Sequence, residues 1–395
     1  MRSNRRLTVN ALWRFALFVF LLGAAAAVTG IAVYYKVIKG GEFLPQEKLD
    51  YYQALDQDYG KYYQMQDLIR ENSIYTIDAD KLDRGIADSV IGAIDDPYAT
   101  YYTEEEYKAF ERKFLSSYTG IGVALAMDEE DRVIVNRVLD GSPAQEEALQ
   151  EGDIIEAIDG TAPTSVQEAS DLIGGEAGTP VTLTLRRGEE SFDVQLYRTD
   201  VEDKSVRFEE YDETSGIGLI TVSAFREGAA EEFKDAVKTL KDRGYEKIII
   251  DVRDNPGGVT QEGVDMADYL LPACKIMTAK NNQGEETVYN SAESAADIEY
   301  IVLVNENTAS TSEIFAGAIQ ANGGAKLVGT QTYGKGLIQA VYKLQDHSVF
   351  KITIEEYFLP GDKKIDGEGL VPDVLSSDDA CYGNAAYLLN IGENR

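Results

Sequence analysis

The stretch "IEYIVLVNENTASTSEIFAGAIQ", residues 298–320, sets the pattern for most of the chain. It opens with an almost unbroken apolar run, which is typical of a strand buried on both faces of a sheet. A polar turn follows, and "EIFAGAIQ" then places apolar residues at helical spacing. The stretch therefore predicts a buried strand, a turn and a helix, the repeating unit of an α/β fold.

Residues 205–375 repeat this alternation. Four earlier segments predict strand, helix, strand and helix in turn: "GIGLITVSAF" (216–225), "GAAEEFKDAVKTLKDRG" (228–244), "KIIIDVRDNPGG" (247–258) and "VTQEGVDMADYLL" (259–271). This order predicts a mainly parallel sheet covered by helices on both faces. The last strands, "GLIQAVYKL" (336–344) and "SVFKITIEEYFL" (348–359), are expected as an antiparallel addition. Sites in such sheets form where strands end, so "RDNPGG" (253–258) and "NENTAST" (305–311) are the candidate positions.

Composition argues against several classes of function. The chain has 395 residues, with 37 Lys and Arg against 69 Asp and Glu, a formal net charge of −32. We expect no nucleic-acid partner, because such binding needs basic patches. One histidine, His347, and two cysteines, Cys274 and Cys381, offer no spacing typical of a zinc site. We therefore expect no metal and no cofactor. Cysteines placed like these are more often free, buried thiols than a disulfide, and both alternatives stay open.

Two further regions precede the α/β region. Residues 116–199 alternate short strands with turns and end in a hairpin, which predicts a small, mostly β module. Residues 45–115 show helical periodicity, and we expect amphipathic helices whose aromatic side chains join a core. Residues 376–395 are expected as a C-terminal tail.

The N-terminus predicts a membrane segment. Four arginines in residues 1–14 precede "FALFVFLLGAAAAVTGIAVYY", residues 15–35, which are 21 uncharged residues. A helix of this length spans a hydrocarbon core of about 30 Å. The arginines favour a cytoplasmic N-terminus, with everything after residue 35 extracytoplasmic. A cleaved signal peptide is the alternative, but its apolar core usually has about 7–15 residues, so we expect an uncleaved signal anchor in the cell membrane.

The turn at 305–311 carries a cluster of hydroxyl side chains: Thr308, Ser310, Thr311 and, just beyond the turn, Ser312. Ser310 and Glu313 fit the S-x-x-E capping box, so a helix cap is the ordinary interpretation. The same place suits a nucleophile, because free helix N–H groups beside it can stabilise an oxyanion. Gly257 and Gly258, at the other strand end, leave room for a substrate carbonyl to approach the backbone.

A nucleophilic serine needs a base. His347 lies in "KLQDHSVFKI", which predicts an exposed turn between two strands. The alternative is Lys335, held between two glycines in "GTQTYGKGLIQ" (329–339), with its pKa lowered by burial. The same stretch resembles a phosphate-binding loop, but Gly336 replaces the required Ser or Thr and a strand follows, so we reject that interpretation.

At these residues the chain resembles the carboxyl-terminal processing (tail-specific) protease family, Ser-Lys peptidases with an embedded PDZ domain. The resemblance covers about residues 45–375 and rests on several motifs in order. They are "YTGIGV" (118–123), "GSPAQEEALQEGDIIEAIDG" (141–160), "DVRDNPGG" (251–258), "VNENTASTSEIFAGAIQ" (304–320), "GTQTYGKGLIQ" (329–339) and "DGEGLVPDV" (366–374). The resemblance implies a multidomain α/β protein: a crotonase/Clp-protease-like core at 205–375, a PDZ domain at 116–199 and an N-terminal helical region at 45–115.

The resemblance also implies the roles of individual residues. Ser310 is expected as the nucleophile, Lys335 as its base and Gln339 as the residue that orients the lysine. Gln339 lies four residues after Lys335, and such residues share a face of an extended strand. The backbone N–H groups of Thr311 and of Gly257 or Gly258 are expected to form the oxyanion hole. Ser312 is expected to act only as part of the helix.

The PDZ resemblance predicts where a substrate binds. Gly120, Ile121, Gly122 and Val123 form "GIGV", whose backbone N–H groups can bind a terminal carboxylate, and "VALAM" can accept the substrate tail by strand addition. The alternative is a turn that only starts a strand. Before the Gly-Asp turn, where the family often has a basic residue and proline, this chain has Gln150 and Glu151. An activation switch that uses that basic residue is therefore not expected here.

The sequence thus predicts a membrane-anchored serine endopeptidase that cleaves extracytoplasmic proteins near their C-termini. Its expected partners are the C-termini of proteins or peptides, and the membrane. A homodimer is one of the assemblies that the sequence leaves open. Two alternatives stay open: a PDZ-containing adaptor with an inactive protease-like domain, and a crotonase-like acyl-CoA enzyme. The membrane segment and the PDZ module argue against the second.

Overall fold

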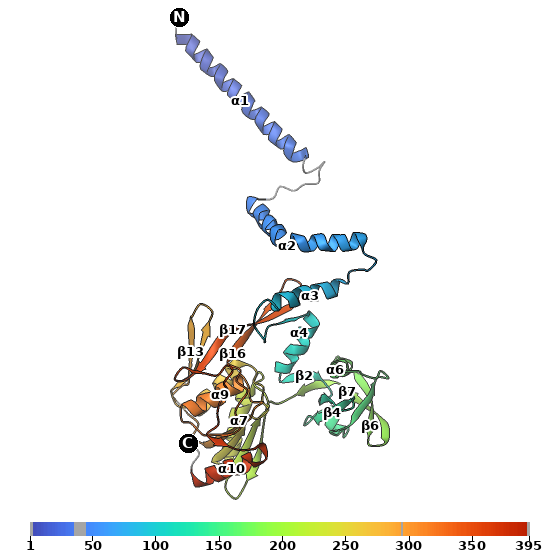
Figure 1. The fold of residues 1–395 in the computed structure, drawn as a ribbon, viewed down its shortest axis with the longest axis vertical. Coiled ribbons are helices and arrows are strands. Elements are labelled where there is room, and N and C mark those ends of the chain that lie inside the picture. The colour runs from blue at the N-terminus through green and yellow to red at the C-terminus, as the bar shows by residue number, and fades with distance from the viewer. Residues whose placement is uncertain (1–2, 35–44, 294, 393–395) are drawn as a thin grey trace. The chain divides into compact units, whose positions relative to one another are not determined.

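The computed structural model describes residues 3–34, 45–293 and 295–392. The chain divides into two compact units, Met1–Ile86 and Ala87–Arg395. Helices α1 (Ser3–Val33), α2 (Gln46–Asn72) and the first part of α3 (Ala79–Ile91) belong to the first unit (Figure 1). The second unit contains the β module and the α/β core.

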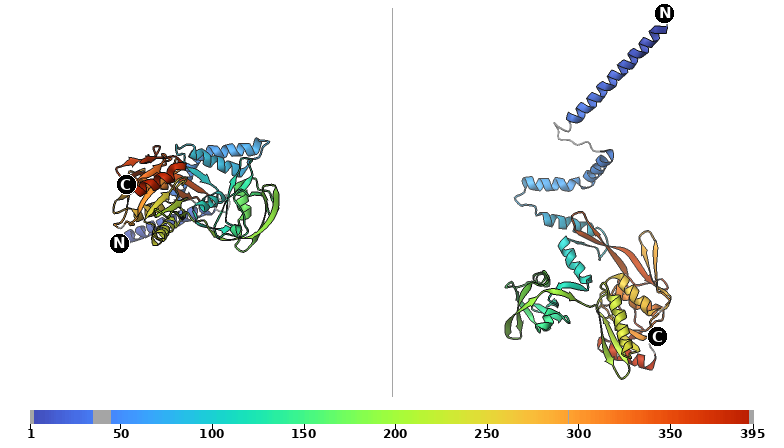
Figure 2. Two further views of the ribbon diagram at one scale, coloured as in Figure 1. Left: turned by 90° about the horizontal axis from the view of Figure 1, so that it is seen from below. Right: turned by 180° about the vertical axis from the view of Figure 1, so that it is seen from behind.

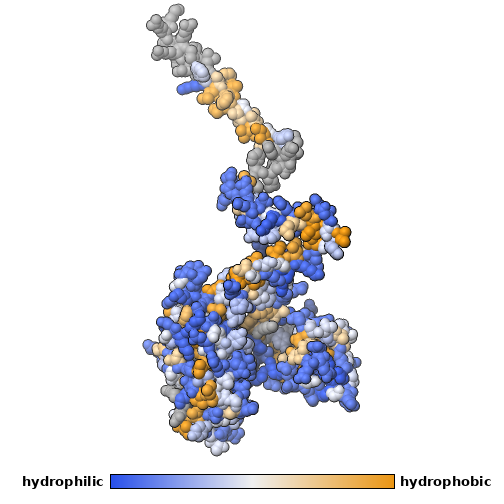
Figure 3. Space-filling view, viewed as in Figure 1, coloured by the Kyte–Doolittle hydropathy of each residue, from blue (hydrophilic) through white to orange (hydrophobic). Residues whose placement is uncertain are grey.

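Helix α1 contains the predicted membrane segment. Residues Trp13–Val33 form a 21-residue stretch with a mean hydropathy of 2.4, long and apolar enough to cross a membrane. Their apolar side chains are exposed along the helix (Figure 3). A signal sequence fits the same description, so the helix supports either an anchor or a signal peptide. Tyr35, the predicted end of the segment, lies outside the described residues.

Helix α2 corrects one expectation. Its aromatic side chains do not join a core: Tyr51, Tyr52, Tyr59, Tyr62 and Tyr63 are all exposed. Gly60 is the buried residue of the helix. The physical reason is that no element of the first unit, as far as the structure describes it, covers α2 along its length.

Residues 116–199 form the predicted β module. Its five-stranded antiparallel sheet has the order β3-β4-β5-β6-β7. The strands are β3 (Val123–Met127), β4 (Val133–Val138), β5 (Ile154–Ile158), β6 (Pro180–Arg187) and β7 (Glu190–Tyr197), with helices α5 (Pro143–Glu146) and α6 (Val166–Ile173). A ribbon of β2 (Ser117–Gly120) and β8 (Thr199–Glu202) leads into and out of the module. Strand β3, the predicted "VALAM" strand, lies at the edge of the sheet.

A six-stranded, mainly parallel sheet forms the centre of the α/β core. Its order is β19-β15-β14-β11-β10-β9, and β9 alone in this sheet is antiparallel to its neighbour. The strands are β9 (Val206–Asp212), β10 (Ile217–Val222), β11 (Lys247–Asp251), β14 (Glu299–Val304), β15 (Leu327–Gly329) and β19 (Val374–Leu375). This order confirms the predicted parallel arrangement.

Helices cover both faces of this sheet, as predicted. Ile248 and Ile250 point to one face, where α7 (Ala229–Asp242), α8 (Thr260–Leu270) and α9 (Thr311–Ala321) pack. Ile249 points to the other face, because successive side chains of a strand alternate. There it meets α10 (Asp378–Ile391), the red C-terminal helix in Figures 1 and 2, through Cys381 and Leu389. The residues expected as a tail thus complete the core.

The predicted antiparallel strands belong to a second sheet. Its members are β1 (Thr100–Tyr102), β12 (Lys275–Asn281), β13 (Glu286–Asn290), β16 (Leu337–Lys343), β17 (Val349–Leu359) and β18 (Lys363–Lys364). The long strand β17 pairs with β1, β12, β16 and β18, so these strands do not extend the parallel sheet. Helix α4 (Glu104–Glu111) and the short helix η2 (Arg112–Phe114) then lead to β2.

Candidate active site

The two candidate strand ends meet at one edge of the parallel sheet. Strands β11 and β14 are adjacent and parallel, with Asp251 opposite Leu303, so the loops that follow them emerge side by side. The Ala309 N–H donates to the Asn255 carbonyl at 3.0 Å, which joins the two loops. The sequence prediction that a site forms here therefore has a structural basis.

Three of the four hydroxyl groups tie these loops together. The Thr308 hydroxyl donates to the Val252 carbonyl at 2.9 Å, and the Ser312 hydroxyl donates to the Asn255 carbonyl at 2.9 Å. The Thr311 hydroxyl donates to the Gly258 carbonyl at 3.1 Å. Each of these hydroxyls has a structural bond, which leaves Ser310 as the candidate nucleophile.

Ser310 stands at the turn into α9 with an unusual backbone. Its φ of 58° and ψ of −118° are rare for a residue with a side chain. Such conformations cost about 1–3 kcal/mol and occur preferentially at functional sites. Here the sharp turn places the serine at the start of a helix, where free N–H groups are available.

The glycine loop lies directly against this turn. A Cβ atom added to Gly257 would lie 3.0 Å from both Ser310 Cβ and Thr311 N. The Gly257 N–H already donates to Asn255 Oδ1 at 2.9 Å. Within the described part of the chain, the N–H groups of Gly258 and Thr311 have no hydrogen-bond acceptor. Of the two glycines predicted for an oxyanion hole, Gly258 is thus the one with a free donor.

The buried carboxylate of Glu313 connects Ser310 to the lysine loop. Oε2 accepts the backbone N–H groups of Ser310 and Lys335, each at 2.9 Å. Oε1 accepts the Gly334 N–H at 2.8 Å and the Thr332 hydroxyl at 2.5 Å. Glu313 therefore does more than cap α9: it holds the backbones of Ser310 and Lys335 to one oxygen atom.

Tyr357 makes a second connection between the same two residues. Its hydroxyl lies 3.2 Å from the Ser310 carbonyl oxygen and 2.9 Å from that of Lys335. The ring is fully buried in β17, and burial raises the pKa of Tyr357 well above its usual value. The phenol thus stays protonated and able to donate. Glu313 and Tyr357 together fix the Ser310 and Lys335 backbones beside each other.

The Lys335 side chain is half-buried. Burial lowers the pKa of Lys335, and the nearby charge of Lys351 lowers it further, against a smaller opposite effect of Glu313. Its Nζ lies 4.7 Å from the centre of the Tyr98 ring. A lowered pKa is what a lysine needs to act as a base near neutral pH.

The geometry around Gln339 differs from the one expected. Strand β16 begins at Leu337, after Lys335, and its register with β17 shifts between Ile338 and Gln339. The two residues are therefore not on one regular strand face. The Gln339 Nε2 donates to the Thr353 hydroxyl at 3.4 Å.

The predicted peptide-binding residues lie beside a groove of the β module. Gly120 ends β2, Val123 begins β3, and both line a cavity of about 380 Å³ between β3 and α6. The Ile121 side chain is fully buried in the core of the module. Gly122 has a φ of 80°, and a Cβ there would overlap the Ser142 side chain, so only glycine fits.

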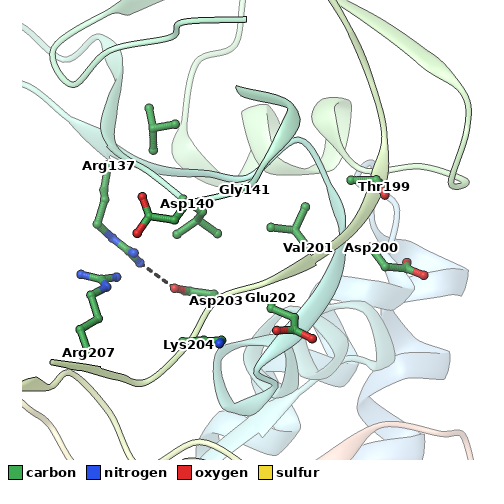
Figure 4. A pocket seen from close by; sticks show the side chains of 12 residues that line it. Arg137, Asp140, Gly141, Thr199, Asp200, Val201, Glu202, Asp203, Lys204 and Arg207 are labelled. Atoms are coloured by element: carbon green, nitrogen blue, oxygen red, sulfur yellow. Dashed lines mark hydrogen bonds and ion pairs between the residues drawn. The ribbon is translucent and has the colours of Figure 1, made fainter. Parts of the chain in front are cut away.

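A larger cavity of about 800 Å³ lies elsewhere, between the β module and its exit strand β8 (Figure 4). Arg137 of β4 pairs there with Asp203 at 2.8 Å, and Arg226 of the α/β core pairs with the same carboxylate at 3.0 Å. None of the residues that line this cavity belongs to the loops around Ser310 and Lys335. It is thus separate from the candidate active site.

The histidine and the two cysteines, for which no catalytic or metal-binding role is predicted, have ordinary surroundings. His347 is exposed in the turn between β16 and β17, as expected. Cys274 and Cys381 are free thiols, the more frequent of the two alternatives, and Cys381 is buried where α10 packs against the sheet. Among the described residues, no group of three or more His, Cys, Asp or Glu side chains is arranged to hold a metal ion.

Comparison with known proteins matches both the α/β core and the β module. The model of peptidase family S41 matches residues 216–376, and that of the PDZ domain matches residues 134–187. A probable CtpA-like serine protease of Staphylococcus haemolyticus is 30% identical over 386 residues, which are 94% of this chain and 74% of the relative. The chain belongs to the carboxyl-terminal processing protease family.

Some relatives are longer than the part of them that aligns with this chain. A probable CtpA-like serine protease of Staphylococcus aureus is 33% identical over 303 residues, 75% of this chain but 60% of the relative. Among solved structures, the photosystem II D1 C-terminal processing protease has a TM-score of 0.50 and 26% identity, with 87% of this chain and 96% of that chain covered. The β module is thus a PDZ domain, and the α/β core is an S41 peptidase domain.

Sequence reasoning missed three residues of this site. Glu313 was recognised as a cap, but its bonds to residues 332–335 cannot be inferred from spacing. Tyr357 has the pattern of an ordinary core aromatic in an alternating strand. Tyr98 lies in "DDPYATYY", which predicts a turn and carries no sign that it reaches Lys335.

Proposed function

We propose that this chain is a serine endopeptidase that cleaves proteins near their C-termini, with Ser310 as nucleophile and Lys335 as base. The observation that carries the proposal is the shared anchoring of the two residues. Their N–H groups bind one Glu313 oxygen, and their carbonyl groups bind one Tyr357 hydroxyl. These bonds hold the backbone of a serine close to that of a half-buried lysine of lowered pKa, which supports the proposed pair.

The chemistry follows from these positions. Ser310 Oγ attacks the carbonyl carbon of the scissile peptide bond while neutral Lys335 Nζ takes its proton. The oxyanion accepts hydrogen bonds from the N–H groups of Gly258 and Thr311, with Gly257 shaping the loop. The lysine then gives the proton to the leaving amine, and water hydrolyses the acyl-enzyme by the same route in reverse. Gln339 is proposed to orient Lys335 once substrate is bound.

The PDZ domain is proposed to capture the substrate C-terminus. Strand β3 is an edge strand, so an extended peptide can add to it, and residues 120–123 lie at its start. The groove beside it is lined by apolar side chains, including Val123, Leu125 and Ile173. An apolar C-terminal tail fits this lining. Residues 13–33 of α1 are proposed to anchor the protein, with the peptidase domain on the extracytoplasmic side.

The test is proteolysis of an unfolded protein by the full-length chain in detergent micelles. We expect Ser310→Ala and Lys335→Ala each to abolish cleavage while circular dichroism shows an unchanged fold. Lys343→Ala, which removes an exposed lysine at the end of β16, is the matched control and should cleave normally. Full activity of Lys335→Ala would refute the lysine base. No cleavage by the unmutated chain of a panel of unfolded substrates would favour the inactive adaptor.

A further inference from the structure

A short segment ahead of the PDZ domain packs beside the lysine. Residues 100–102 form β1, which pairs with β17 so that Thr100 lies opposite Lys351. Farther along β17, the backbone N–H of Thr353 donates to the Asp96 side chain and not to the backbone of a neighbouring strand. This segment lies more than 200 residues from Lys335 in sequence and is absent from every motif that identified the site.

Asp96 fixes this segment to β17. Its carboxylate accepts the Thr353 N–H at 2.9 Å and the Thr353 hydroxyl at 3.0 Å, together with the Tyr98 N–H at 2.9 Å. Burial raises the pKa of Asp96, but the hydrogen bonds from Thr353 and Tyr98 outweigh it and lower the pKa overall. The Thr353 hydroxyl in turn accepts from Gln339. One carboxylate thus links the segment to a predicted member of the catalytic set.

Tyr98 contacts another member. Its ring is half-buried, and Lys335 Nζ lies 4.7 Å from the ring centre. An ammonium group within about 6 Å of an aromatic face is attracted to it.

We propose that Tyr98 is a positioning residue for Lys335, and that Asp96 holds its ring in place through Thr353. The proposal deepens the proposed function, because it rests on Lys335 being the base. The Lys335 ammonium group rests against the fixed Tyr98 ring between catalytic cycles. A flexible side chain is thereby kept in one place, which reduces the entropy lost when it takes the serine proton.

Several groups influence the charge of Lys335. The charged and titratable residues around it and Tyr98 are Glu313 from α9, Lys351 from β17, Tyr333 from its own loop and Asp366 from the loop after β18. The ring face favours the ammonium form, in opposition to burial and Lys351. Replacing the ring by an aliphatic side chain of similar bulk should therefore make Lys335 easier to deprotonate.

The experiment compares Tyr98→Leu, Tyr98→Phe and Tyr269→Leu in the full-length protein. Tyr269→Leu, in α8, is the matched control, because the Tyr269 ring is also half-buried but packs against Phe233. Two quantities are measured: the pH profile of kcat/KM on a peptide substrate, and the pH dependence of Lys335 labelling by an amine-reactive reagent. The labelling uses the Ser310→Ala background and mass spectrometry, so it does not depend on activity.

For Tyr98→Leu we expect both midpoints to move to lower pH by about half a unit or more, and kcat to fall with KM little changed. Tyr98→Phe and Tyr269→Leu should keep the original midpoints. Unchanged midpoints in Tyr98→Leu would overturn the proposal. If Tyr98→Leu does not fold, Tyr98→Met provides the same comparison. Activity that survives Lys335→Ala would instead refute the proposed function, whatever the labelling shows.

Discussion

Replacing Glu313 by glutamine tests whether one buried carboxylate assembles the active site. The change keeps the size of the side chain but turns one of its two oxygens into an NH2 group. In the structure each oxygen accepts two hydrogen bonds: Oε1 from Thr332 and Gly334, and Oε2 from Ser310 and Lys335. Either orientation of the amide therefore leaves two donors facing an NH2 group.

The size of the effect follows from these bonds. A hydrogen bond to a charged group contributes about 1.5–3 kcal/mol, so the loss of two costs about 3–6 kcal/mol. For a domain of this size each kcal/mol lowers Tm by about 2–4 °C, so we expect a fall of at least about 6 °C. Displacement of Ser310 or Lys335 by about 1 Å would lower kcat/KM by about 100-fold.

The assays are differential scanning calorimetry and peptide hydrolysis on the full-length protein. Glu232→Gln is the control, because this partly buried carboxylate of α7 also accepts a backbone N–H, from Val206 at 2.9 Å, but lies outside the site. We expect the control to lose some stability and to keep its kcat/KM below its own Tm. Wild-type Tm and kcat/KM in Glu313→Gln would refute the role assigned to this carboxylate.

Three further outcomes are expected. Lys351 lowers the pKa of Lys335. Because the proposed mechanism uses the neutral lysine, activity should rise with pH through that pKa. Lys351→Gln should move this rise to higher pH in a pH–rate profile. Gly258→Ala should lower kcat by about 100-fold in the hydrolysis assay, because a Cβ there overlaps the Phe225 carbonyl and displaces the proposed oxyanion donor. Gly383→Ala, with open space around it, should be neutral. A peptide with an amidated C-terminus should bind at least about tenfold more weakly than its free acid in calorimetric titration, and equal affinities would rule out carboxylate recognition.

The parallel sheet and its helices were predictable because their patterns are local. A strand buried on both faces, such as residues 300–304, is almost entirely apolar. An amphipathic helix such as α7 repeats its apolar residues every three to four positions. The PDZ strands were predictable for the same reason. Strands β16 and β17 were predictable as well, as an antiparallel pair. Their place in a separate sheet with β1, β12 and β13 was not, because pairing between segments so far apart in sequence leaves no local pattern.

Helix α2 shows what hydrophobic periodicity cannot predict. Its tyrosines have helical spacing, which predicts a buried face, yet they are exposed. Periodicity shows that a helix has an apolar face and does not show what covers it. Helix α10 is the opposite case. Its sequence has only a weak pattern, yet it covers the second face of the parallel sheet.

The sequence by itself determined which residues belong to the candidate site: Ser310 at a strand-to-helix turn, Lys335 between glycines, and the glycine pair 257–258. These depend on local chemistry and on turns that few residue types can form. Only the tertiary structure decided how they are held: three hydroxyls bound to the neighbouring loop, one carboxylate and one phenol joining the two backbones, and the Tyr98 ring against the lysine. Those contacts join segments up to about 240 residues apart, and the spacing of residues along a chain carries no information about which distant segments will meet.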